Sequence, residues 1–142
     1  MNSYRFEDLY EGMNVSFEES VTEEMMDAFR RISGDENPLH MKKEFAQSQG
    51  YRDRVVYGML TSSFLSQLVG VHLPGKYCLL QGMELKYLNP VYAGDTLTVK
   101  GTVDELHPSV KTAVIKALIT NQDGIKVVKG KINVGFLQYE DE

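Results

Sequence analysis

The chain has 142 residues, of which 42% are hydrophobic and 25% are charged, and its formal net charge at pH 7 is −5. This length and composition are typical of one globular domain with its own core, and we expect a single domain over residues 1–142. The acidic balance gives no electrostatic footprint for nucleic acid, so no nucleic-acid partner is expected. Every apolar stretch is shorter than the roughly 18 residues of a membrane-spanning helix, so no membrane partner is expected either.

The single cysteine, Cys78, sits in an apolar stretch at residues 77–80 that is typical of a strand. One cysteine excludes an internal disulfide and fits a reducing compartment. Its apolar surroundings favour a small core residue over a nucleophile. The start of the chain lacks the basic flank and apolar centre of a secretion signal. We therefore expect a cytoplasmic protein.

The first third of the chain predicts one short strand and one amphipathic helix. Residues 13–17 have strand character, and residues 22–32 favour a helix whose N-terminal cap is Ser20 or Thr22. Ser20 and Glu23 have the spacing of a capping box, in which each side chain bonds the backbone amide of the other residue. The helix is expected to bury one stripe of side chains, formed by Met25, Ala28, Phe29 and Ile32.

Residues 34–40, with the sequence GDENPLH, follow directly and carry the most chemical information. Gly34 suits the position just past a helix end, and Pro38 disfavours a helical conformation for Asn37. Asp35 and His40 are therefore expected on a shaped turn, where a carboxylate and an imidazole can converge as a general acid and base. The same residues also suit a plain turn, because Asp and Asn side chains bond nearby backbone amides.

Residues 42–47 favour a short helix, and residues 57–69 form the predicted central helix of the fold. The central helix has apolar side chains around much of its circumference and no charge between Arg54 and Lys76, so we expect it to be buried. Gly58 lies in its first turn, where backbone N–H groups lack helical partners. A glycine there lets a ligand oxygen approach the amide, which suits an oxyanion or a polarised carbonyl.

The second half of the chain is rich in predicted strands. Residues 77–88 form a long strand candidate that ends at Asn89 and Pro90, and a turn at Gly94 follows. Alternating apolar residues indicate further strands around 97–103, over 111–120 and over 132–136, with a hairpin turn at residues 121–124. Four consecutive strands joined by short turns predict an antiparallel sheet, which must cover the central helix in an α+β fold.

Four segments of the chain resemble the MaoC-like dehydratases, and among them the (R)-specific enoyl-CoA hydratases. They are SGDENPLH at residues 33–40, VYGM at 56–59, LPG at 73–75 and NPVYAGD at 89–95. The first motif is fairly specific, the others are weak alone, and all four fall in the order of the family. The resemblance spans roughly residues 10–137. It implies a hot-dog fold, in which a curved antiparallel sheet wraps around a central helix.

The resemblance also implies an activity, the reversible hydration of a trans-2-enoyl thioester to the (R)-3-hydroxyacyl thioester. Asp35 and His40 would hold and activate the water, in roles as base and acid that the sequence leaves undecided. Asn37 and Ser66 are expected to orient the site, although Ser66 is explained equally well as a small residue of a buried helix. The Gly58 N–H is expected to bind the thioester carbonyl.

One position departs from the family pattern. The family usually has histidine just before the glycine that matches Gly58, and this chain has Tyr57. Tyrosine keeps a hydrogen-bonding group on a flat ring but does not become cationic near neutral pH. We therefore regard Tyr57 as a candidate for the substrate pocket, where it would alter the preference for the acyl group or its carrier.

The expected substrate brings its own coenzyme A or acyl carrier, so no separate cofactor is expected. The spacing of the three histidines does not resemble a metal site. Four basic residues near the motif could contact a phosphate of the substrate or simply face solvent: Lys42, Lys43, Arg52 and Arg54. The resemblance implies a homodimer that extends the sheet across its interface, or a dimer of dimers. Two other functions remain open, a hot-dog thioesterase and a non-catalytic module that binds acyl-CoA or an acyl carrier.

Overall fold

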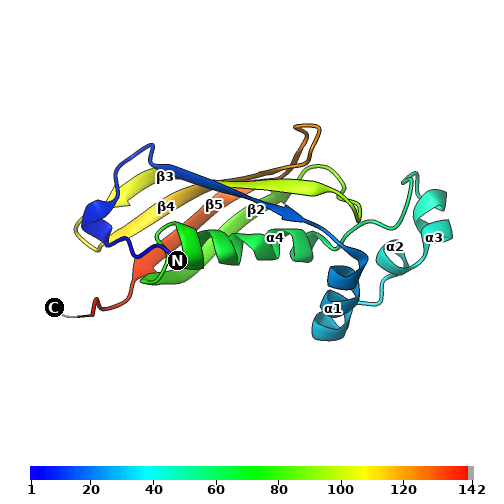
Figure 1. The fold of residues 1–142 in the computed structure, drawn as a ribbon, viewed down its shortest axis with the longest axis horizontal. Helices are drawn as coiled ribbons and strands as arrows, with labels where there is room; N and C mark the ends of the chain where they lie inside the picture. Colours follow the sequence, from blue (N-terminus) through cyan, green and yellow to red (C-terminus); the bar gives the residue numbers. More distant parts are fainter. Residues whose placement is uncertain (141–142) are drawn as a thin grey trace.

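The computed structural model describes residues 1–140, which form an antiparallel sheet that curves over one central helix (Figure 1). The strands are β1 (Asn14–Ser20), β2 (Cys78–Tyr87), β3 (Thr96–His107), β4 (Thr112–Thr120) and β5 (Lys126–Phe136). The helices are η1 (Phe6–Asp8), α1 (Glu23–Ser33), α2 (Pro38–Met41), α3 (Lys43–Ser48), α4 (Gly58–Gln67) and η2 (Leu68–His72). The expected α+β fold, with a sheet wrapped around a central helix, is confirmed.

The strand order in the sheet is β1-β3-β4-β5-β2, which differs from a simple run of hairpins. The sequence predicted short turns between consecutive strands, but β2 pairs with β5 rather than with β3. Residues 88–95 form a crossing loop instead. Val56 N–H donates to Val91 C=O at 2.8 Å, and Gly94 N–H donates to Val21 C=O at 2.8 Å. The loop therefore ties the end of the sheet to the segments that lead into α1 and α4.

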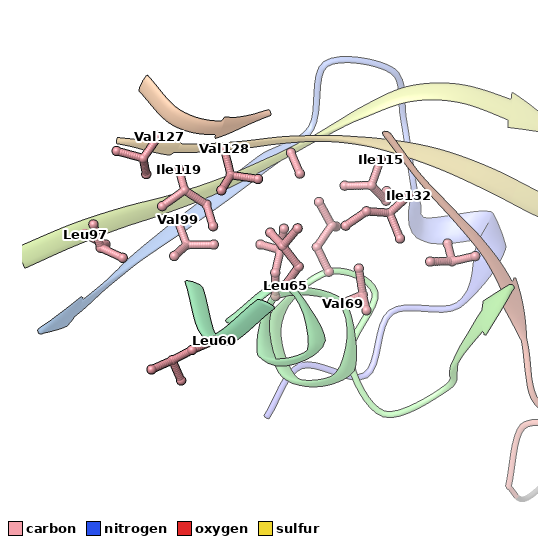
Figure 2. Packing of buried hydrophobic residues seen from close by; sticks show 14 of the residues in the cluster. Leu60, Leu65, Val69, Leu97, Val99, Ile115, Ile119, Val127, Val128 and Ile132 are labelled. Atoms are coloured by element: carbon pink, nitrogen blue, oxygen red, sulfur yellow. The ribbon is translucent and has the colours of Figure 1, made fainter. Parts of the chain in front are cut away.

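The core lies between α4 and the face of the sheet that curves over it (Figure 2). Leu60 and Leu65 of α4, and Val69 just after it, meet inward-facing side chains of β3, β4 and β5. The alternation predicted for residues 111–120 is confirmed, since the buried residues there include Ala113, Ile115, Ala117 and Ile119. Full burial of a Leu, Ile or Val side chain stabilises a fold by about 1.5–3 kcal/mol, so this cluster fixes the position of α4 against the sheet.

The N-terminal cap of α1 is Thr22, whose hydroxyl accepts a hydrogen bond from Met25 N–H at 3.1 Å. The predicted capping box is wrong, because the Ser20 hydroxyl lies 3.3 Å from that of Thr96 across the β1–β3 pair. The predicted buried stripe is only partly right, because Met25 and Phe29 are half-buried against the core and the buried residue of α1 is Met26, outside the stripe. Ile32 is 82% exposed, since α1 projects beyond the end of the sheet (Figure 1).

One side of α4 is open, contrary to the prediction that the helix is buried all round. Met59 is 71% exposed and Ser66 is exposed on the same helix. The neighbouring edge strand β2 also presents exposed apolar side chains, namely Leu79, Leu80, Met83 and Tyr87. α4 has only 10 residues, and no helix among residues 1–140 is long and apolar enough to cross a membrane.

The opposite face of the sheet carries a group of lysines, which we call the lysine face: Lys86, Lys100, Lys116, Lys126, Lys129 and Lys131. They line a shallow hollow of about 750 Å³. Two pairs stand directly opposite each other on neighbouring strands, Lys86 with Lys129 and Lys116 with Lys131. Asp104 lies 3.8 Å from the Lys116 ammonium and 3.4 Å from that of Lys131, which compensates the second pair.

Candidate active site

The turn that carries the 34–40 motif begins where α1 ends. Gly34 has φ of 73°, the left-handed conformation that glycine adopts without strain, and its N–H donates to Arg30 C=O at 2.8 Å. Asp35 Oδ1 accepts from Asn37 N–H at 3.0 Å. Both features match the sequence prediction of a shaped turn.

The second half of the motif forms α2, so the prediction that His40 lies on a turn rather than in a helix is wrong. Pro38 occupies its first turn, where proline needs no N–H partner, and Asn37 Oδ1 caps it by accepting from Leu39 N–H at 2.9 Å. Asn37 thereby fixes the direction in which His40 leaves the turn. The role of Asn37 in orienting the site stays a prediction. The hydrogen bond by which Asn37 caps α2 is one way in which it could do so.

His40 is held through one nitrogen of its ring. Nδ1 lies 2.7 Å from the backbone oxygen of Val55. A carbonyl oxygen can only accept a hydrogen bond, so Nδ1 carries the proton in this contact and Nε2 of the neutral ring keeps a free lone pair. Nε2 is therefore the atom of His40 that can accept a proton from a bound water.

Tyr57 connects the two residues predicted to be catalytic. Its hydroxyl donates to the backbone oxygen of Asp35 at 2.8 Å, and its ring stacks on the ring of His40 with centroids 4.2 Å apart. Phe29 of α1 packs on the same ring at 4.9 Å. Burial and the nearby Asp35 carboxylate raise the pKa of Tyr57, so its hydroxyl remains a proton donor at neutral pH. This bracing role was missed, because nothing in the local sequence joins positions 22 residues apart.

A polar cavity of about 210 Å³ is lined in part by His40 and Tyr57, together with Arg30 and Arg54. The predicted place of Tyr57 in a substrate pocket stays a prediction. An Arg54 nitrogen lies 3.4 Å from His40 C=O, and another lies 3.4 Å from a Glu23 carboxylate oxygen. The rest of the predicted basic group lies elsewhere: the Arg52 guanidinium sits 3.9 Å over the ring of Tyr92, and the two lysines are exposed.

Gly58 lies in the first turn of α4, as predicted, and is the first residue of that helix. Leu60 and Thr61 N–H both donate to Tyr57 C=O, so the Gly58 N–H precedes the first bonds of the helix. A Cβ at Gly58 would lie 3.1 Å from the ring of Tyr87, so a larger residue there would require that ring to shift. A second cavity, of about 230 Å³, opens at this glycine.

Within one chain, the structure does not bring Ser66 close to Asp35 and His40. Ser66 lies eight residues after Gly58, or about 12 Å along a helix that rises 1.5 Å per residue, on the exposed side of α4. Among residues 1–140, no hydrogen bond or ion pair joins it to Asp35 or His40. Its predicted role in orienting the site stays a prediction.

The remaining residues of chemical interest lie away from the pair. His72 stacks on Phe17 with ring centroids 4.5 Å apart, and His107 is exposed at the end of β3. Cys78 packs against the core, and its burial raises the pKa of the thiol to about 11. Such a thiol is a poor nucleophile near neutral pH, in line with the core role expected for it.

Comparison with known proteins identifies the family to which this chain belongs. The model of the family described as "MaoC like domain" matches residues 9–123. The chain belongs to the MaoC-like family. Among relatives of this MaoC-like protein, the (R)-specific enoyl-CoA hydratase of Rhodospirillum rubrum is 33% identical over 129 residues, which cover 91% of this chain and 89% of the relative. The (R)-specific enoyl-CoA hydratase of Aeromonas caviae is 36% identical and covers 73% of this chain and 78% of the relative.

Solved structures agree with this assignment. The (R)-hydratase of Aeromonas caviae superposes with a TM-score of 0.86 at 31% identity, covering 91% of this chain and 98% of that one. An R-hydratase from Pseudomonas aeruginosa gives 0.87 at 27% identity, covering 95% of this chain and 86% of that one. The MaoC-like protein therefore has the hot-dog fold, as the four sequence motifs predicted.

Proposed function

We propose that this protein catalyses the reversible hydration of a trans-2-enoyl-CoA to the (R)-3-hydroxyacyl-CoA. One observation carries the proposal. Asp35 and His40 are braced by the same tyrosine, and each has a free atom, Oδ2 of the carboxylate and Nε2 of the imidazole, without a hydrogen bond among residues 1–140. The activity named for the two hydratase relatives supports the same chemistry.

In the proposed reaction, a water is held between Asp35 Oδ2 and His40 Nε2. Nε2 takes one proton from the water as its oxygen bonds to C3 of the substrate. The electrons of the C2–C3 double bond move through C2 to the thioester oxygen, which becomes an enolate. The enolate collapses by taking a proton at C2 from the imidazolium, which returns His40 to its neutral form.

The enolate oxygen needs a hydrogen-bond donor during this reaction, and the Gly58 N–H is the proposed one. It lies at the positive end of α4 and immediately follows Tyr57, which braces the acid–base pair. A preorganised donor at such an oxyanion contributes about 10²–10³-fold to the rate in known enzymes. Water addition and proton transfer need no redox or metal chemistry, so coenzyme A enters only as part of the substrate.

We further propose that two chains pair through β2. An edge strand exposes unpaired backbone groups, and β2 carries exposed Leu79, Leu80 and Met83 beside the open side of α4. A Tyr87–Ser62 hydroxyl contact of 3.0 Å places β2 next to that helix. A second copy along β2 would cover these apolar side chains together and would extend the sheet. It would also turn the exposed side of α4, including Ser66, from solvent into the dimer interface.

The deciding experiment is a spectroscopic assay with crotonyl-CoA. A hydratase removes the absorbance of the conjugated enone without releasing a thiol, and chiral analysis should find the (R)-3-hydroxybutyryl product. Release of free thiol would indicate a thioesterase instead. Binding of crotonyl-CoA without either change would indicate a non-catalytic acyl-CoA module, and both results would contradict the proposal.

A further inference from the structure

The lysine face is a strongly charged surface that the proposed reaction does not use. Its ammonium groups are all exposed, although the chain as a whole has a net charge of −5. Two carboxylates adjoin them, since Asp104 contacts Lys116 and Lys131, and Glu84 stands opposite Lys131. The other four lysines of the face have no ion pair within residues 1–140: Lys86, Lys100, Lys126 and Lys129. The face therefore has cationic groups free to bind an anionic partner.

The register of the sheet places three of these free lysines in one row with a leucine. Lys100 on β3 and Lys129 on β5 both stand opposite Leu118 on β4, one on each side of it. Lys86 on β2 follows next to Lys129. Leu118 is half-buried and lines the hollow of about 750 Å³. Neighbouring strands lie about 4.8 Å apart, so the row from Lys100 to Lys86 spans roughly 14 Å.

The composition of the hollow distinguishes between classes of anionic partner. In the part of the chain that the structure describes, neither an arginine nor an aromatic side chain lines it. Arginine is the residue that binds phosphate groups in a bidentate manner, and aromatic rings are what stack on nucleotide bases. A lipid bilayer is flat and does not reach an apolar side chain in a hollow. A half-buried leucine between lysines instead resembles a protein interface, in which an apolar centre has a polar rim.

We propose that the lysine face binds a partner protein through an acidic amphipathic helix, whose carboxylates contact the free lysines and whose apolar side chains cover Leu118. A helix with its side chains is about 10–12 Å across, which fits the roughly 14 Å row. Glutamates three or four positions apart lie on one side of a helix, about 5–6 Å from each other, which is close to the spacing of the strands. An amphipathic helix in an apolar groove is a recurring mode of recognition.

This interaction is separate from the proposed hydration. The central helix α4, which begins at the proposed oxyanion donor Gly58, lies on the other side of the sheet (Figure 1). A partner on the lysine face would therefore not displace a substrate bound at Gly58. The partner would hold the enzyme next to another protein while the active site continues to work.

A synthetic peptide tests the proposal. The probe is a fluorescent helical peptide with glutamates on both sides of a leucine stripe, and its counterpart has glutamine at each glutamate. By fluorescence anisotropy, the wild type should bind the acidic peptide at about 50 mM salt at least tenfold more tightly than the counterpart, and more weakly at about 200 mM salt.

Two double variants show where the peptide binds. Lys100→Gln with Lys129→Gln should weaken the acidic peptide about tenfold, since two free ammonium groups are lost. Lys42→Gln with Lys43→Gln removes the same charge from exposed residues outside the hollow and should leave the affinity unchanged. An equal loss in both double variants would point to net charge and overturn the proposal.

Leu118→Ala separates a bound helix from a general attraction of polyanions. It should weaken the acidic peptide about threefold, because apolar contact is lost, and leave binding of inorganic triphosphate unchanged. Circular dichroism checks that this variant is folded. Unchanged peptide affinity in folded Leu118→Ala would contradict the proposed helix. Tighter binding of a DNA oligonucleotide or of phosphatidylglycerol vesicles than of the peptide would assign the face to another class of partner, and absence of peptide binding at low salt would overturn the proposal as well.

Discussion

The hydroxyl of Tyr57 donates a 2.8 Å hydrogen bond to the backbone oxygen of Asp35, and the ring that bears it stacks on His40. One buried side chain therefore contacts both the backbone of exposed Asp35 and the half-buried imidazole of His40 in α2. Because the MaoC-like pattern usually has histidine at this position, the tyrosine gives this chain its own way of bracing the pair.

Changing Tyr57 to phenylalanine should lower kcat by about tenfold with little change in KM, since the ring and its stacking stay and only the bond to Asp35 is lost. Steady-state kinetics with crotonyl-CoA measure this split. Tyr57→His, the residue usual in the family, should restore part of kcat. Wild-type kcat in Tyr57→Phe would show that the bond does not position the pair.

Removing either proposed acid–base group should have a larger effect. Asp35→Asn and His40→Ala should each lower turnover by about a hundredfold or more, the usual scale for such groups. Their circular dichroism should match the wild type, because Asp35 on the turn and His40 in the short helix α2 both lie outside the hydrophobic core. Glu36→Gln is a matched control in the same motif and should retain activity. Near wild-type turnover in either Asp35→Asn or His40→Ala would refute the site assignment.

Charge introduced on the edge strand should separate the proposed dimer. Leu80→Lys places an ammonium on β2, where the second copy would pair, and sedimentation at micromolar concentration should then report a monomer. Val110→Lys makes the same kind of change at an exposed residue of the β3–β4 turn and should leave the dimer intact. Ser66→Ala should keep the dimer and lower activity less than the two changes in the acid–base pair. A wild-type monomer would remove this proposal altogether.

The buried thiol predicts an alkaline loss of stability. Burial raises the pKa of Cys78 from 9.0 to about 11, so at pH between these values the folded state holds a proton that the unfolded state has released. The stability that the protonated Cys78 thiol contributes to the folded state is complete below about pH 9 and is lost as the pH rises through about 11. Urea unfolding at pH 7.5, 9 and 10.5 should show a steeper decline for the wild type than for Cys78→Ala. Parallel declines would place the thiol in contact with water.

Relief of a repulsive pair on the lysine face should stabilise the fold. Lys86 and Lys129 stand directly opposite on β2 and β5, and like charges in this position are destabilising by about 0.2–1 kcal/mol. Lys129→Glu should raise the free energy of unfolding by an amount of this order, and added salt should reduce the gain. Lys126→Glu makes the same charge change on the same face opposite Thr120 and is the control. An equal gain in both variants would point to net charge rather than the pair.

Local features of the fold were predictable because their causes are local. Gly34 at a helix end and the alternation from Ala113 to Ile119 are patterns of neighbouring residues, and both were confirmed. The hairpin at residues 121–124 was also predicted, and its turn is held by Asn121 Oδ1, which accepts from the N–H groups of Asp123 and Ile125. The pairing of β2 with β5 was not predictable in this way, since it depends on where a crossing loop takes the chain.

The other differences between the sequence predictions and the structure concern which side chains are exposed and which residues distant in sequence are in contact. The apolar character of Ile32 or Met59 indicates that burying the side chain would be favourable, but it does not indicate which element would cover it. Both side chains are mostly exposed among residues 1–140. The Tyr57–Asp35 bond depends on the tertiary arrangement around α4. The sequence could identify Tyr57 only as a departure from a family pattern.

The lysine face limits how this protein can build larger assemblies. A two-fold axis brings the same patch of both partners together, so stacking two sheets through this face would set ammonium groups against ammonium groups. Such a contact would need bound anions to hold it, and it would dissolve as they were diluted. If the proposed dimers pair further, we therefore expect them to use another surface and to leave this lysine-rich face, on which Glu84 and Asp104 are the neighbouring carboxylates, in contact with water.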